Sequence, residues 1–442
     1  HTQSFYEVKS KKLLIYNAMD CASTARIYQK MLNEQRWQEP RTQKLYAMHV
    51  ELSKLCAQMH TAGIWVHRMN QAFMSWFYER IYDQKEKKFL RLVDVPSMRC
   101  TSDDLRKLIF KRHATKKISR FNLPDPFDPK MYTDETLEKI SVDSSCLRLL
   151  IAEGDIPPEL KQIILAYWEA ESAWKSRTFL VSKKTSQAIG PDGYLRPGWN
   201  SCGTDTMRFS CRDPNVMQWD KQLLQMLGVP DGEMLIGMDK AQLEIRVVEI
   251  VSKDDYLWKL IQTGDVYSAD VREALGLAAT VNVKKDYPDA RQQFKINRLA
   301  CQYQAGLATV YSQWLVEIPD VEFTTVKAHY TRFHRMHEHG LDQYAKDEME
   351  KCAAIGYSEG RVLHGRRYYP RPPPITEACN WPIQRTASEM MNIETLAYVK
   401  RLKDEVPLAK MIFQKHDAVV TRCPERFTTK VARIKHEMFS TE

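Results

Sequence analysis

Two aspartates, Asp239 and Asp417, occupy positions at which carboxylates could share metal ions. The segment MLIGMDKAQLEIRVVEIVS begins as a short apolar strand that ends at Asp239, after which apolar residues recur at helical spacing. Far downstream, MIFQKHDAVVTR reads as two short strands around His416 and Asp417, which places the second acid at a hairpin tip. Two such acids could hold a pair of Mg²⁺ ions that activates a hydroxyl and stabilises a leaving pyrophosphate. For either acid alone, a turn or capping residue is the simpler interpretation.

Between these acids lies a segment with helical spacing that carries cations at one end and an aromatic ring at the other. Within DARQQFKINRLACQYQAGLATVYSQWL, the residues Arg291, Lys295, Leu299 and Tyr303 recur at every fourth position and so drift slowly along one face. Lys295 and Tyr303 would stand roughly 12 Å apart on a helix, close to the span from a nucleotide's phosphates to its base. The cations would hold a triphosphate, and the ring would stack on a base. The alternative, which remains open, is an ordinary helix whose basic residues are solvent-exposed and whose following apolar residues pack in the core.

The elements that must position these residues change in character along the chain. Residues 1–37 contain the helical segment YNAMDCASTARIYQKMLNE, and residues 43–92 are rich in helix formers, interrupted at Gly63. A Pro/Asp cluster, NLPDPFDPK, predicts a loop before helices resume at 158–182. The Gly/Pro punctuation of GPDGYLRPGWN then indicates short strands, so we place a domain boundary near residue 181.

The composition is that of an ordinary folded protein. The chain has 442 residues, of which 43% are hydrophobic and 27% charged, and it is long enough for about three domains. No run approaches the ~20 apolar residues of a membrane span, and the start HTQSFYEVKSKK lacks the apolar core of a signal peptide. We therefore expect an intracellular protein without membrane association, in the cytoplasm or nucleoid, or in the host cytoplasm if the protein is viral, with an organelle as a further alternative. The ten cysteines show no paired spacing, so we expect reduced thiols rather than a metal site. The net charge of +9 is compatible with a polyanionic partner but does not establish one.

Five ordered blocks of the sequence resemble family A DNA polymerases, the bacterial polymerase I type. Each block is similar to a motif of that family, and weaker similarity extends over nearly the whole chain. The blocks are TDTMRFSCRDPNVMQ (204–218), DKAQLEIR (239–246), R-x3-K-x3-L-A-x2-Y (291–303), NWPIQRTASE (380–389) and QKHDAV (414–419).

The resemblance implies an α/β (α+β) right-hand polymerase, with a mixed antiparallel-sheet palm, helical fingers and a helical thumb. We expect the thumb at 38–180, the palm at 181–251 and 366–442, and the fingers at 252–365. The implied activity is template-directed addition of dNTPs to a primer 3′-OH, with primer-template DNA as the partner. We expect a monomer, and the sequence identifies no processivity partner.

The resemblance also implies a role for each matching residue. Asp239 and Asp417 would be the catalytic ligands of two Mg²⁺ ions, which Mn²⁺ could replace. Arg291 and Lys295 would grip the triphosphate, with Lys295 as general acid toward pyrophosphate. Glu244 would exclude a ribose 2′-OH, and Tyr303 would sit at the templating position. Gln242 and Leu299 complete the dNTP-binding set, and the residues expected to hydrogen-bond the primer terminus and minor groove are Arg208, Asn215, Asn380, Gln384, Gln414 and His416.

Departures from the family motifs keep two other functions open. Leu299 replaces an aromatic residue, Gln304 and Ala300 replace glycines, and Ala418 replaces the acid that follows the catalytic aspartate. A catalytically silent, polymerase-like DNA-binding protein is therefore one alternative. A single-subunit RNA polymerase is a second, disfavoured because Glu244 would exclude ribose.

The beginning of the chain resembles part of another domain. Tyr16 and Asp20 in YNAMD match the Y-x3-D motif that closes the family's 3′-5′ exonuclease domain. The partner acids of that motif should lie upstream. We therefore expect residues 1–37 to be the carboxyl-terminal remnant of an exonuclease domain in a chain cut from a longer polymerase. A stray helix with this spacing is the alternative.

Overall fold

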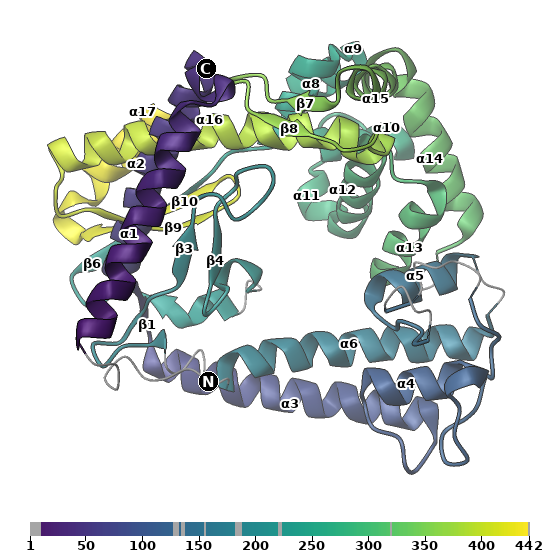
Figure 1. Cartoon of the computed structure of the whole chain (residues 1–442). Helices are drawn as coiled ribbons and strands as arrows, with labels where there is room; N and C mark the ends of the chain where they lie inside the picture. The colour runs from purple at the N-terminus through teal and green to yellow at the C-terminus, as the bar shows by residue number, and fades with distance from the viewer. Residues whose placement is uncertain are drawn as a thin grey trace.

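The computed structural model describes residues 10–126, 132–133, 138–153, 156–181, 188–219, 223–318 and 321–440. Within these residues helices dominate, and four small antiparallel sheets lie among them (Figure 1). The predicted loop NLPDPFDPK lies partly outside the described residues, at 127–130. The predicted domain boundary near residue 181 borders 182–187, which the structure also does not describe.

The sheet that carries both predicted carboxylates has three strands in the order β6-β10-β9. Strand β6 (Glu233–Asp239) pairs antiparallel with β10 (Ala418–Pro424), which pairs in turn with β9 (Lys410–Lys415). Burial alternates along β10, as expected of a strand with one face on a core. Helix α17 (Thr428–Phe439) packs on β6 and β10, and the long helix α16 (Ile375–Glu405) packs on α17 and on α8 (Leu243–Ser252). The predicted strand-to-helix change after Asp239 and the predicted hairpin are both confirmed.

Helix α2 (Pro40–Ala62) packs against this region, on β9, on α16 and on β3 (Gly198–Asn200). Strand β3 pairs with β4 (Ser210–Arg212). Helix α2 ends at Gly63, as predicted, where the backbone φ is 62° and an added Cβ would lie 3.0 Å from the Cβ of Tyr194. Beyond it, β1 (Ile64–Val66) pairs with β2 (Tyr194–Leu195) and with β5 (Leu227–Gly228), which anchors the next helix.

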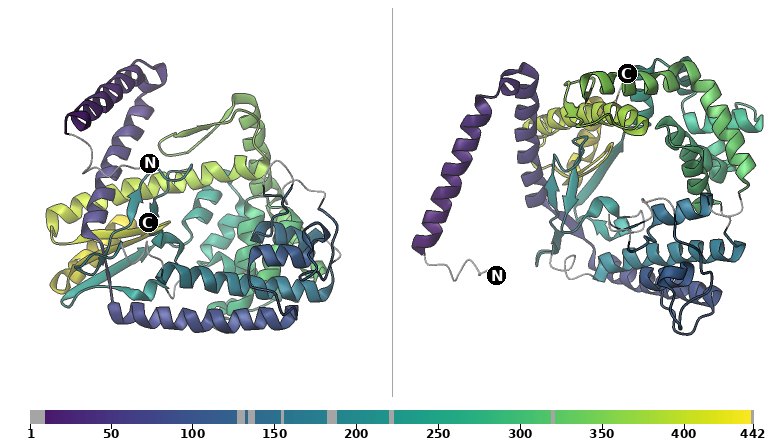
Figure 2. Two further views of the ribbon diagram at one scale, coloured as in Figure 1. Left: turned by 60° about the horizontal axis from the view of Figure 1, so that its bottom comes forward. Right: turned by 45° about the vertical axis from the view of Figure 1, so that its right-hand side comes forward.

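Two long helices, α3 (Arg68–Val93) and α6 (Pro158–Val181), pack side by side and form an arm. The short helices α4 (Ser102–Ile109) and α5 (Ser144–Glu153) lie at its far end. The arm has its own hydrophobic core, in which Phe89 and Tyr167 place their ring centroids 5.8 Å apart. Helix α1 (Ser10–Leu32) stands away from the rest of the molecule and is joined to α2 through the 3₁₀ turn η2 (Gln35–Gln38) (Figure 2).

The region between β6 and α16 is almost entirely helical. Its longer helices are α12 (Pro288–Gln302), α13 (Leu307–Glu317), α14 (Phe323–His337) and α15 (Gln343–Ile355), and a π-helical turn, η7 (Glu338–Asp342), joins the last two. The shorter helices are α9 (Asp255–Gln262), α10 (Val266–Leu275) and α11 (Val283–Asp286). A hairpin of β7 (Tyr357–Glu359) and β8 (Arg366–Tyr368) leads into α16. The predicted helix over Arg291–Tyr303 is confirmed, with Tyr303 as its C-terminal cap. The domain boundaries given above remain predictions.

Candidate functional site

The two predicted metal-binding aspartates lie at one end of the β6-β10-β9 sheet. Asp239 ends β6 directly opposite Ala418, the first residue of β10. His416 and Asp417 form the two-residue turn between β9 and β10, and His416 has a positive φ of 53°, which such turns require. The backbone N–H of Lys240 donates to the carbonyl of Asp417 at 3.2 Å. Antiparallel pairing therefore brings together two acids that are 178 residues apart in the sequence.

The electrostatics of this end of the sheet suit a divalent cation. Burial raises the pKa of Asp417, and the nearby charge of Asp239 raises it further, while Arg208 and Lys240 lower it. The side chain of Lys240 already has a partner, because its Nζ donates a hydrogen bond of 2.6 Å to Glu394. Mg²⁺ is commonly held by one or two carboxylates together with substrate phosphates, and this pair of hard oxygen donors fits that requirement. Among the described residues, no group of three or more His, Cys, Asp or Glu side chains is arranged to hold a metal ion.

Glu244 connects the strand region to the end of α12. It is paired with Arg208, and it accepts a hydrogen bond of 2.8 Å from the hydroxyl of Tyr303. Burial raises the pKa of the Tyr303 phenol, so its hydroxyl stays protonated and donates a hydrogen bond. These three residues come from three of the sequence blocks, and the fold brings them into one chain of contacts.

A second cluster forms around Asp265, which precedes α10. Its carboxylate accepts two hydrogen bonds from Arg291, at 2.7 and 3.0 Å, and one of 2.9 Å from Gln242. The side chains of Arg291 and Lys295 both lie over the ring of Tyr267, at 5.3 and 5.8 Å from its centroid. Asp265 and Tyr267 are absent from the predicted site, because an acid after glycine at a helix start reads as an ordinary cap.

Five of the six residues predicted to contact the primer and minor groove line one of two pockets. Arg208, Gln414, His416 and Asp417 line one, together with Ser388 and Asn392 of α16. Asn380 and Gln384, one turn apart on α16, line the other beside Asp205 and Thr206. Asn215 lies in neither pocket and accepts a hydrogen bond of 3.4 Å from the thiol of Cys211.

The remaining predicted residues lie elsewhere. Leu299 is half-buried on α12. Tyr16 and Asp20 lie exposed on α1, the helix that stands away from the rest of the molecule.

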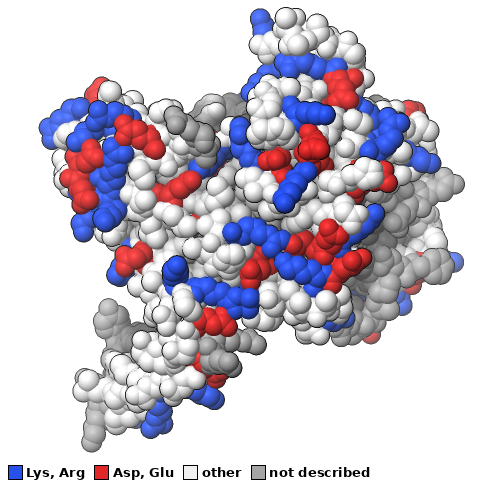
Figure 3. All heavy atoms as spheres, turned by 90° about the horizontal axis from the view of Figure 1, so that it is seen from above, with Lys and Arg blue, Asp and Glu red and all other residues white. Residues whose placement is uncertain are grey.

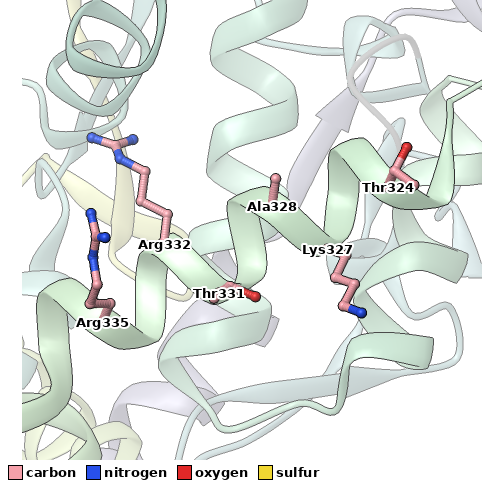
Figure 4. Close-up of a pocket in the computed structure, with 6 residues that line it drawn as sticks. All are labelled: Thr324, Lys327, Ala328, Thr331, Arg332 and Arg335. Atoms are coloured by element: carbon pink, nitrogen blue, oxygen red, sulfur yellow. The ribbon is translucent and has the colours of Figure 1, made fainter.

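Two surface features lie outside these clusters. An open hollow on α14 is lined by Thr324, Lys327, Ala328, Thr331, Arg332 and Arg335 and shares no residue with the predicted site (Figure 4). The face drawn in Figure 3 carries interspersed acidic and basic side chains, so the excess positive charge is not gathered there into one patch. None of the helices that the structure describes combines the length and the apolar character needed to cross a bilayer.

The family model for DNA polymerase family A matches residues 79–442. This chain belongs to DNA polymerase family A. It is 22% identical to DNA polymerase I of Chloroflexus aurantiacus over 99% of this chain and 45% of that protein, and 23% identical to the thermostable DNA polymerase I of Thermus thermophilus over 88% and 44%. A DNA polymerase of Bacillus phage SP01 is 24% identical over 58% of this chain and 30% of that protein. The chain thus spans less than half the length of these relatives.

A solved structure confirms the predicted fold class. The polymerase domain of Pol1 from M. smegmatis, in complex with DNA primer-template and dNTP, matches with a TM-score of 0.68 at 17% identity, over 88% of this chain and 66% of that one. The mixed helical and antiparallel-sheet architecture is therefore that of a family A polymerase domain.

Proposed function

We propose that the chain is a template-directed DNA polymerase that adds dNTPs to a primer 3′-OH and acts inside the cell on primer-template DNA. The observation that carries the proposal is the convergence of Asp239 and Asp417 on one sheet end, with the Arg208–Glu244–Tyr303 contacts beside them. A carboxylate pair alone would support many metal-dependent reactions. Its combination with a cationic helix and a buried aromatic ring favours nucleotidyl transfer.

The chain's own residues would divide the work as follows. Asp239 and Asp417 would hold two Mg²⁺ ions, which lower the pKa of the primer hydroxyl and neutralise the leaving pyrophosphate when bound. Arg291 and Lys295 would receive the triphosphate, and Lys295 would donate a proton to the departing pyrophosphate oxygen. Because Arg291 is held by Asp265 in this structure, nucleotide binding would exchange a carboxylate for a phosphate as its partner.

The polar groups around the hairpin would position the primer. Arg208, Gln414 and His416 line the pocket next to Asp417, where a primer terminus has to lie for in-line attack. Burial lowers the pKa of His416, and the charges of Arg208 and Lys415 lower it further, so its imidazole is neutral at pH 7 and can accept one hydrogen bond while donating another. Asn380 and Gln384 would contact the minor groove, where the acceptors are shared by all base pairs.

Primer extension with purified protein tests the proposal. Asp239→Ala and Asp417→Ala should each abolish Mg²⁺-dependent extension while leaving primer-template affinity within a few-fold, because the carboxylates serve the metal ions rather than the DNA. Asp404→Ala, an exposed acid on α16, is the matched control and should extend normally. Near-normal extension by either catalytic-site variant would overturn the assignment. Binding without extension by the unaltered chain would favour the silent, DNA-binding alternative.

A further inference from the structure

Helix α13 connects two hydrophobic cores that the sequence gives no reason to join. On one side, Val310 and Trp314 are buried in the larger core, together with residues of α14 and α16. On the other side, Leu315 is fully buried in the core of the α3/α6 arm. Tyr311 and Val321 pack against both cores. The helix is therefore buried from two sides, as expected of a bridge between two bodies.

The partner of α13 in the arm is α5, at the far end from the point where the arm leaves the sheet region. Leu147 and Ile151, one turn apart on α5, are buried in the same core as Leu315. The side chains that α5 and α13 place in this shared core are apolar. Hydrophobic burial therefore holds the contact, and salt should weaken it little.

This contact completes a closed circuit of packed elements. The arm is attached at its base through β1 and the 3₁₀ turn η6 (Leu223–Met226) and runs along α3 and α6 to α5, which meets α13. From α13 the circuit returns through α14 and η7 to α8, and then through α16 and α17 to the carboxylate-bearing sheet. Figure 1 and the right-hand view of Figure 2 show this ring, with α12 and the β9–β10 hairpin on its inner side.

We propose that the α5–α13 contact closes the polymerase around its primer-template and serves as a built-in processivity clamp. The proposal rests on the proposed function, because the enclosed ligand is the primer-template of that reaction. A nucleic acid held at Asp239 and Asp417 lies on the inner side of the circuit and can leave sideways only if α5 parts from α13. Dissociation would then be limited by exposure of Leu315 and Leu147, whereas single-nucleotide chemistry would not depend on the contact.

Extension of a primed circular single-stranded template, with heparin added together with the dNTPs, tests the clamp. Leu315→Lys and Leu147→Lys bury a charge at the contact from opposite sides. Each should shorten the run of nucleotides added per binding event by roughly tenfold or more, because affinity changes of this kind appear mainly in the dissociation rate. The rate of the first incorporation by preformed complexes should change by less than about twofold.

Two further variants separate loss of the clamp from loss of folding. Phe89→Ala removes a ring from the same arm core, where it packs on Tyr167 between α3 and α6, and should leave the run length unchanged. Tyr311→Ala trims the contact without introducing a charge and should shorten the run to an intermediate length. Normal run lengths in Leu315→Lys and Leu147→Lys, with both proteins folded by circular dichroism, would overturn the proposal.

Enclosure itself has a topological signature. High salt removes the contacts to phosphate. Under these conditions the unaltered protein should stay bound to closed circular DNA and dissociate once a restriction enzyme linearises it. Leu315→Lys should dissociate from both circular and linear DNA. Equal loss of the unaltered protein from circles and linear DNA would also overturn the proposal. This binding assay requires no synthesis, so a chain that bound circles topologically but never extended a primer would contradict only the proposed function.

Discussion

Glu244 is the residue on which sugar selection can be tested most directly. Arg208 and the Tyr303 hydroxyl hold its carboxylate from two sides, so the group has little freedom to withdraw from a ribose 2′-OH. Glu244→Ala should raise rNTP use relative to dNTP by about tenfold or more, since about 1.4 kcal/mol of lost discrimination is already a factor of ten. Steady-state incorporation of both nucleotides by the variant measures this ratio.

Leu299→Tyr is the matched control for that experiment. It restores an aromatic ring to α12 and should change dideoxynucleotide use while rNTP exclusion stays intact, because the two residues would contact different sugar positions. If Glu244→Ala discriminated as well as the unaltered enzyme, the gate assignment would fail and the RNA polymerase alternative would reopen.

Gln304 shows how a departure from the family motif can be accommodated. It follows Tyr303 with a positive φ of 58°, a conformation that favours glycine, and its side chain donates to Asp342 at 2.7 Å. Asp342 also contacts His334 at 2.8 Å. The end of α12 is thus tied to the π-turn after α14. Gln304→Ala and Asp342→Ala should each lower the free energy of unfolding. Together they should lower it by less than the sum of the two single effects, with a coupling of about 0.5–3 kcal/mol.

Urea unfolding of the two single variants and the double variant gives that coupling. Gln343 makes the same kind of bond to Asp347, also at 2.7 Å, but on an exposed helix face. The corresponding single and double variants of Gln343 and Asp347 should give a coupling energy near zero, since exposed polar pairs contribute little to stability. Strict additivity at Gln304 and Asp342 would show that the bond does not anchor α12.

At the scale of elements, the packing of α17 against the sheet depends on a buried lysine. Lys435 is only 2% exposed, and its Nζ donates to the carbonyls of Ile236 and Val419 at 2.6 and 3.0 Å. Burial lowers its pKa from 10.5 to about 7. The unfolded chain therefore binds a proton that the folded chain lacks between these two values, so this residue makes stability rise with pH across that window and fall as pH drops toward 7.

The slope attributable to Lys435 has an upper limit of about 1.4 kcal/mol per pH unit. The unfolding free energy of the unaltered protein, measured at several pH values, should increase relative to that of Lys435→Met as pH rises above about 7. Comparing the two proteins removes the contribution of every other group that titrates in the same range. Parallel pH profiles would mean that the folded protein keeps Lys435 charged.

Local pattern was enough to predict the elements that carry the site, but not all of its residues. The strand ending at Asp239, the hairpin at Asp417 and the helix beginning before Arg291 were predicted because their periodicity is local. Asp265 was missed because its partners, Gln242 and Arg291, come from distant segments and its own context indicates only a cap. Leu315 was unpredictable for a related reason: an apolar position on a helix indicates burial, but not which of two cores receives it.

At the scale of the whole molecule, the family model matches residues 79–442, whereas Tyr16 and Asp20 lie before that match, on the separate helix α1. Their spacing matches an exonuclease motif, but Tyr16 is 60% exposed, and the described residues provide no cluster of acids around Asp20. Excision of a 3′ nucleotide by two metal ions requires several carboxylates at one place. We therefore expect this chain to leave a mismatched primer terminus intact in the presence of Mg²⁺ and absence of dNTPs. Asp20→Ala should extend primers at the normal rate. If the purified chain shortened the primer in a metal-dependent way, and Asp20→Ala abolished this shortening, α1 would instead carry a working nuclease residue.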